Sequence, residues 1–160
     1  MKKIFSFILL SAILLSCISC GSNEKNLAVG AKDLLDSMFK KCPTGELSVE
    51  FTDLGETDAD EFAYHFFTEY NSAYKETSVA LASISSIPFF VGIVSCSSTE
   101  SAKELCEKIE ENMNLSKWVC ATAESAYVER ASNTVVLIMD IEPQRAESLK
   151  NAFLELTGTK

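Results

Sequence analysis

Residues 89–113 read FFVGIVSCSSTESAKELCEKIEENM and contain the two clearest elements of the chain. The run from Phe89 to Val94 is apolar at nearly every position, which predicts a buried strand. Ser97 and Glu100 then have the spacing of a capping box, which predicts the start of a helix. The apolar residues of this helix recur every three or four positions, as one buried face requires: Ala102, Leu105, Cys106, Ile109 and Met113.

The segments on the C-terminal side continue with strands and a final helix. Three stretches have the composition of strands: Trp118 to Ala121, Tyr127 to Arg130 and Val135 to Ile141. Ser132 and Asn133 are predicted to form a turn before the last of them. Pro143 suits the first turn of a helix, and Gly158 is expected to end it.

The segments on the N-terminal side add two helices and further strand material. Apolar positions at helical spacing predict a helix over residues 27–41, and alternation predicts a strand over residues 47–52. Thr57 suits the N-cap of a short helix that carries several aromatic residues. Residues 77–87 are rich in Ser and in β-branched side chains, so they are interpreted as a strand or a loop.

These elements predict an α+β domain over residues 27–158. We expect two layers, with a small, mostly antiparallel or mixed sheet and with the helices packed on one face. The order of elements is not a regular alternation of strand and helix, and no Gly-rich fingerprint follows the first strand. A doubly wound nucleotide-binding fold is therefore not favoured.

The first twenty residues are interpreted as a secretory signal peptide. Lys2 and Lys3 are followed by an apolar run from Ile4 to Leu15, about 12 residues long, which is shorter than the roughly 20 residues that a membrane-spanning helix needs. Residues 21–26 are expected to be a polar tether between this segment and the domain.

The end of this segment resembles the lipobox of bacterial lipoproteins, in which a cysteine receives a lipid and becomes the new N-terminus. Cys17 follows Leu14-Leu15-Ser16, whereas Cys20 precedes the flexible sequence Gly21-Ser22-Asn23. Both cysteines are therefore candidates for lipidation, and a redox C-x-x-C pair is the rival interpretation. The resemblance implies a protein held by acyl chains such as palmitate on the extracytoplasmic face of the cell membrane.

The charge of the chain argues against some partners. The net charge is −9, so phosphate backbones of nucleic acids and anionic lipid headgroups would both be repelled. We therefore expect no nucleic acid partner, and we expect the lipid to supply the attachment to the membrane.

The C-terminal half resembles small bacterial lipoproteins that carry domain of unknown function 4358. The resemblance covers residues 91–153, and its motifs are a strand that ends in a polar turn, the following helix, Lys117-Trp118-Val119-Cys120, and the strand from Val135 to Met139. It implies a location in the cell envelope and a compact α+β domain, and it carries no established activity.

Thiol chemistry is the alternative function that the sequence leaves open. Four cysteines lie downstream of the signal: Cys42, Cys96, Cys106 and Cys120. They could be buried apolar side chains, or pair in disulfides, of which Cys96 with Cys120 is the first choice. A thiol-dependent envelope enzyme would use Cys96 or Cys120 with His65, the only histidine.

The sequence offers no metal site and no cofactor motif, so neither is expected. Asp58, Asp60 and Glu69 have the spacing of positions 1, 3 and 12 of a calcium-binding EF-hand loop. Phe62 stands at the fifth position and Ala63 at the sixth, where the loop needs a ligand and a glycine. The acidic residues are instead interpreted as stabilising the start of a helix.

The aromatic segment around this helix is the least ordinary feature of the sequence. Four of its residues, spaced four apart, form a possible contact surface for a protein, peptide or glycan: Phe62, Phe66, Tyr70 and Tyr74. The competing interpretation is that the segment covers the sheet. The sequence as a whole thus predicts a lipid-anchored, non-catalytic binding or structural module of the cell envelope.

Overall fold

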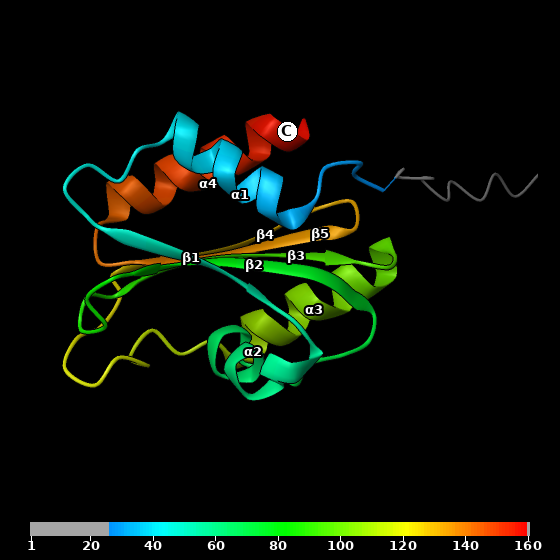
Figure 1. Ribbon diagram of the computed structural model, residues 1–160, viewed down its shortest axis with the longest axis horizontal. Coiled ribbons are helices and arrows are strands. Elements are labelled where there is room, and N and C mark those ends of the chain that lie inside the picture. The colour runs from blue at the N-terminus through cyan, green and yellow to red at the C-terminus, as the bar shows by residue number, and fades with distance from the viewer. Residues whose placement is uncertain (1–25, 160) are drawn as a thin grey trace, which may run out of the picture.

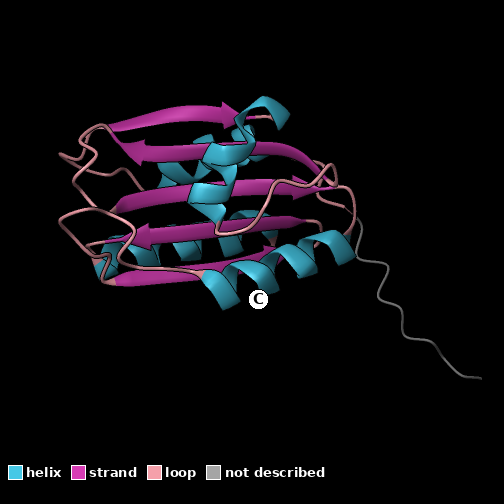
Figure 2. Cartoon of the chain, turned by 90° about the horizontal axis from the view of Figure 1, so that it is seen from below, coloured by secondary structure: helices cyan, strands magenta, loops and turns pink. Residues whose placement is uncertain are grey.

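The protein contains one five-stranded antiparallel sheet in the computed structural model, which describes residues 26–159. The strand order is β1-β2-β3-β5-β4, and every neighbouring pair is antiparallel. Figure 2 shows the strands side by side with alternating directions. Their bounds are Val49–Leu54 for β1, Tyr74–Ala82 for β2, Phe89–Cys96 for β3, Ser125–Ala131 for β4 and Thr134–Asp140 for β5.

Helices cover both faces of this sheet, as Figure 1 shows with the sheet viewed on edge. One face is covered by α1 (Ala31–Lys41) and α4 (Pro143–Thr157). The other face is covered by α2 (Ala59–Phe66), which follows the short 3-10 helix η1 (Glu56–Asp58), and by α3 (Thr99–Asn112). Among the described residues, no helix is long and apolar enough to span a membrane.

The predicted α+β class is confirmed, but the prediction that helices cover one face only was wrong. The reason lies in β3 and β5, where almost every residue is buried, so both faces need a cover. Val91 and Ile138 face α1 and α4, whereas Phe90 and Leu137 face α2 and α3. A strand that is apolar at successive positions has apolar side chains on both faces of the sheet, so each face needs a cover.

The ends of two helices agree closely with the signals in the sequence. Pro143 is the first residue of α4, and Gly158 ends it with a left-handed φ of 70°. Ser98, one position after the predicted Ser97, caps α3 and accepts a hydrogen bond from the Ser101 amide at 3.1 Å. The predicted turn at Ser132 and Asn133 is also confirmed, because these two residues join β4 to β5.

Two predicted elements differ from the structure. Residues 118–121 form part of a loop between α3 and β4 and no strand. The aromatic helix is shorter than expected, because Phe67 takes a left-handed φ of 58° and ends α2, and Tyr74 already belongs to β2. Residues 77–87 were interpreted as a strand or a loop, and they contain both. The second half of β2 ends at Ala82, and a loop follows it.

The two ends of the sheet have different surroundings, and this difference positions the candidate site. At one end the Leu27 amide donates to Asn133 Oδ1 at 2.8 Å, and Asn133 Nδ2 donates to the carbonyl of Cys96 at 2.8 Å. The segment before α1 is thereby fixed beside the last residue of β3. The loop from β2 to β3 and the loop from α3 to β4 lie at the opposite end, on the left in Figure 1. The predicted signal peptide, Cys17 and Cys20 lie outside the described residues.

Candidate functional site

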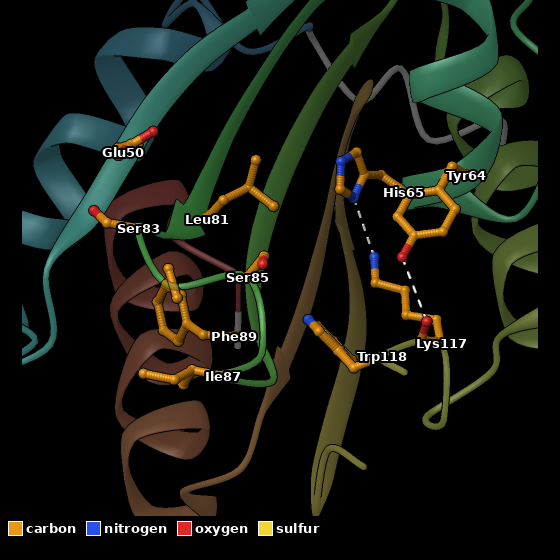
Figure 3. Close-up of a pocket in the computed structure, with 11 residues that line it drawn as sticks. Glu50, Tyr64, His65, Leu81, Ser83, Ser85, Ile87, Phe89, Lys117 and Trp118 are labelled. Carbon is orange, nitrogen blue, oxygen red and sulfur yellow. Dashed lines mark hydrogen bonds between the residues drawn. The ribbon is translucent and has the colours of Figure 1, made fainter. Parts of the chain in front are cut away.

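A cavity of about 320 Å³ opens at the end of the sheet where β2 finishes and β3 begins. Leu81, Ile87 and Phe89 form one wall, and Tyr64, His65, Lys117 and Trp118 form the other. Figure 3 shows these two groups facing each other across the cavity. The cavity therefore joins the sheet, α2 and the loop from α3 to β4.

Helix α2 supplies the His65 and Tyr64 side chains. Its apolar residues Phe62 and Phe66 point into the core, which fixes the rotation of the helix about its axis. His65 consequently points inward and is 6% exposed, whereas Tyr64 is 55% exposed at the rim. The Tyr64 hydroxyl lies 3.4 Å from the Lys117 carbonyl oxygen and donates to it, which connects the helix to the loop.

Short-range hydrogen bonds shape the loop that carries Lys117 and Trp118. Asn114 Oδ1 accepts from the Ser116 amide at 2.9 Å, which forms a turn just before Lys117. The Ala123 amide then donates to the carbonyl of Leu115 at 3.0 Å, so the loop closes on itself. These contacts direct the two side chains between them toward the sheet.

The Lys117 ammonium is surrounded by aromatic rings. Its Nζ atom lies 4.3 Å from the ring centre of Phe90 and 5.0 Å from that of Trp118. Tyr64 and Phe67 follow at 5.2 and 5.4 Å. Within the described residues, Lys117 forms no ion pair with a carboxylate. Ring faces favour a cation, but they replace solvation by water only in part.

His65 is the polar neighbour of this ammonium. Its ring is stacked on Phe90 at 4.9 Å with an interplanar angle of 6°, and its Nδ1 atom lies 3.1 Å from Lys117 Nζ. Burial, with the charge of Lys117 as a smaller contribution, lowers the pKa of His65 to about 3. His65 is therefore neutral near pH 7, its Nδ1 accepts from Lys117, and the 3.8 Å approach of Glu61 to Nε2 is not an ion pair there.

Burial lowers the pKa of Lys117 to about 7. The aromatic faces act in the opposite direction, because they stabilise the protonated form. The loss of water dominates, since no carboxylate compensates for it. A substantial fraction of the amine is therefore uncharged near pH 7, where an ordinary lysine is almost fully protonated. An uncharged amine can act as a nucleophile or a base.

The structure does not bring Cys96 together with His65. Phe90, on which His65 stacks, is six residues before Cys96 on the same strand, so the two positions are roughly 20 Å apart. Cys96 is also buried, which raises its pKa to about 12 and keeps the thiol protonated. The predicted pairing of Cys96 with His65 was therefore wrong.

Cys120 is not positioned for thiol catalysis either. It is exposed in the loop after Trp118, and the ring nitrogens of His65 face Lys117 and Glu61 instead. No disulfide is formed by the four described cysteines, so the suggested bridge from Cys96 to Cys120 is absent. Burial also raises the pKa of Cys106 to about 11.

The aromatic residues chosen as a contact surface lie mainly inside the protein. Phe62, Phe66 and Tyr74 are buried, and Tyr70 is half-buried. Phe62 stacks on Phe66 at 4.6 Å and on Tyr74 at 5.2 Å. The prediction of an exposed patch was wrong because the sheet face above α2 is apolar and takes these rings as its cover.

The acidic residues near the start of α2 have local roles. Asp58 Oδ2 accepts from the Gly55 amide at 2.9 Å, which stabilises the start of η1. Asp58, and not the predicted Thr57, is the N-cap residue of α2, where its side chain accepts no capping hydrogen bond. Within residues 26–159, no three His, Cys, Asp or Glu side chains are grouped so that they could hold a metal ion.

Comparisons with protein-family models, with curated proteins and with solved structures find no match to this chain. Sequence reasoning assigned no role to Lys117, although one signal was present. Lys117 precedes the only tryptophan and lies in a stretch, residues 112–123, that contains no acidic residue.

Proposed function

We propose that this protein is a non-catalytic binding domain for a small organic ligand, held on the outer face of the cytoplasmic membrane by a lipid on Cys17 or Cys20. The cavity beside Lys117 is its binding site. The observation that carries the binding function is an apolar cavity into which a few polar groups converge. Ligand sites have this composition in general, and a volume of about 320 Å³ suits a small molecule.

The walls of the cavity favour a ligand with a flat or apolar body. Leu81 and Phe89 contribute hydrophobic surface from the sheet, Ile87 contributes it from the loop between β2 and β3, and Trp118 faces them. Ser83 and Ser85 lie at the rim with hydroxyl groups that can donate or accept. The polar end of a ligand would then meet Lys117.

The position of the cavity supports an anchor at the N-terminal side. Leu27 is bound beside Cys96 at one end of β3, and the cavity lies at the other end, near Phe89. The eight residues of β3 separate the two ends by roughly 23 Å. A tether over residues 21–26 would thus join the domain at the end of the sheet opposite the cavity.

The binding function can be tested through the fluorescence of Trp118, which is the only tryptophan and lines the cavity. We expect benzyl alcohol, a small flat neutral compound, to change the emission of the detergent-extracted protein with saturation. Ser85→Phe is expected to fill the mouth and abolish the change. Ser86→Phe is the matched control, because Ser86 is exposed in the same turn and does not line the cavity.

A series of small flat and aliphatic acids, alcohols and aldehydes extends this test beyond a single compound. Saturable binding that Ser85→Phe removes and Ser86→Phe preserves supports the proposal. If no compound in the series produces a saturable change in Trp118 emission, or if both variants bind as the wild type does, the cavity is not the binding site.

A further inference from the structure

We infer that Lys117 is a nucleophilic amine that captures a small aldehyde or ketone in this cavity as a reversible imine. This inference rests on the proposed function, since it names the chemical class of the ligand for the same site. It is supported by the position of the amine, the nature of its neighbours and the shape of the cavity.

The position of the amine leaves it free to react. Lys117 Nζ donates one hydrogen bond, to His65 Nδ1 at 3.1 Å. No other acceptor within the described residues is hydrogen-bonded to this atom, and no carboxylate forms an ion pair with it. Donation of one N–H to His65 leaves the lone pair of the neutral amine at one of the remaining tetrahedral positions, away from the imidazole.

The neighbours of the amine favour its uncharged form. Phe90, Trp118 and Phe67 replace water around Nζ, and the Nδ1 atom of the neutral His65 faces it as an acceptor. This agrees with the lowering of the Lys117 pKa to about 7. Desolvation in an apolar pocket is a general way in which proteins activate lysine toward carbonyl compounds.

The chemistry requires no oxidant, reductant or cofactor. The Nζ lone pair attacks the carbonyl carbon, and a proton moves from nitrogen to the former carbonyl oxygen, which gives a carbinolamine. The C–O bond then breaks, the oxygen leaves as water after taking a second proton from solvent or nitrogen, and a C=N bond remains. When this imine is protonated, its positive charge lies where the ring faces of Phe90 and Trp118 already stabilise a cation.

A carboxylate ligand is the main competing occupant, because it would pair with the ammonium form of Lys117. The aldehyde is favoured because the site lacks what a carboxylate site usually contains. In most carboxylate sites, the paired N–H groups of an arginine side chain or several backbone amides share the negative charge. Here a carboxylate would meet one partly uncharged amine that is surrounded by aromatic rings.

The experiment uses the detergent-extracted protein with benzaldehyde and sodium cyanoborohydride near neutral pH. Cyanoborohydride reduces an imine to a stable secondary amine, and peptide mass mapping then assigns the modified lysine. We expect Lys117 to be modified at least about tenfold faster than the exposed Lys103 on α3, since an ordinary lysine has a very small neutral fraction at this pH.

Two variants and the pH dependence of the modification rate complete the test. Lys117→Arg is expected to abolish the fast modification, whereas Lys103→Arg is expected to leave it intact. In the wild type, the rate at Lys117 should level off a little above pH 7, while the rate at Lys103 should continue to rise to higher pH. This profile needs no variant, so it remains informative if Lys117→Arg does not fold.

The outcomes separate this inference from the proposed function. If Trp118 emission shows that benzaldehyde binds but Lys117 is modified no faster than Lys103, the imine chemistry is refuted and the binding function stands. If benzoate binds and blocks an otherwise slow reaction at Lys117, the site is a carboxylate site, and the inference is again overturned. If no compound binds, the proposed function fails first.

Discussion

The Nζ atom of Lys117 lies 3.1 Å from Nδ1 of His65, although the two residues are 52 positions apart in the chain. Both groups are basic, and burial lowers the pKa of each. At neutral pH the pair carries at most one positive charge, and this charge lies on Lys117. Each group therefore has a predictable effect on the pH dependence of stability.

The first prediction concerns Lys117 and alkaline stabilisation. The folded pKa is about 7 and lies below the ordinary value of 10.5 in the unfolded chain. Between these values the unfolded state binds more protons, so the free energy of unfolding rises with pH. From pH 7 to about pH 8.5 the wild type should gain about 1.5 kcal/mol from this group. Urea unfolding at the two pH values measures the gain.

Lys117→Met should lose this gain, and Lys103→Met should keep it, because Lys103 is exposed on α3. The window ends near pH 9, where ionisation of buried thiols begins to favour the unfolded state. Equal gains for the wild type and Lys117→Met would show that the amine is not held in an uncharged form by the fold.

The second prediction concerns the acid side and His65. Its folded pKa of about 3 lies below the ordinary 6.5, so the neutral form is favoured by folding. This contribution is complete above pH 6.5 and is lost as the pH falls toward 3. His65→Phe retains the stack on Phe90 without a titrating group. We expect its denaturation midpoint to fall less than that of the wild type between pH 7 and about pH 4.5.

The third prediction concerns Gly92 in the middle of β3. A Cβ atom at this position would lie 2.5 Å from Phe66 Cζ and 2.6 Å from Phe90 Cζ. Because both rings are buried and packed, Gly92→Ala should destabilise the protein by about 1 to 3 kcal/mol. Gly55→Ala is the control, since its Cβ would meet nothing nearer than 3.7 Å. Phe66→Leu should recover part of the loss in the double variant.

The fourth prediction concerns the ion pair between β5 and α4. Asp140 is fully buried and receives two hydrogen bonds of 2.7 Å from Arg145. Arg145→Met leaves this carboxylate without its countercharge, which should cost about 3 kcal/mol or more. Lys32→Met breaks the exposed pair with Asp53, which solvent screens, and should cost far less. Similar costs for the two variants would contradict this ranking.

The fifth prediction concerns the lipid. In cells supplied with labelled palmitate, the wild type should be labelled and should partition into detergent. Of the variants Cys17→Ser and Cys20→Ser, one should lose both properties, and the other should retain them. Intact mass of the extracted protein then identifies the modified N-terminus. Full labelling of both single variants with loss only in the double variant would point to modification of either cysteine, and no labelling of the wild type would refute the anchor.

The elements of the fold were largely predictable from short stretches of sequence. The apolar runs of β3 and β5, the periodicity of α3, and Pro143 and Gly158 at the ends of α4 are all signals between near neighbours in the chain. Such signals depend on backbone geometry and on local hydrogen bonds. They do not depend on which distant segment supplies the packing partner.

The aromatic segment shows where this reasoning stops. Spacing placed Phe62, Phe66 and Tyr74 in one group, and the structure does bring them together. Whether the group faces solvent or the sheet depends on β3 and β5, which present an apolar face to α2 as well as to α1. Helices cover both faces of the sheet, and this arrangement decides that the aromatic group is buried. It is a property of the assembled sheet.

The sequence by itself determined an α+β domain with strongly apolar strands, because periodicity and caps report the local conformation of the backbone. Only the tertiary structure decided the site. Lys117 and His65 are unremarkable residues on separate segments until folding brings them to one end of the sheet. Their altered protonation then follows from the exclusion of water by Phe90 and Trp118, and desolvation of this kind exists only when distant segments pack together.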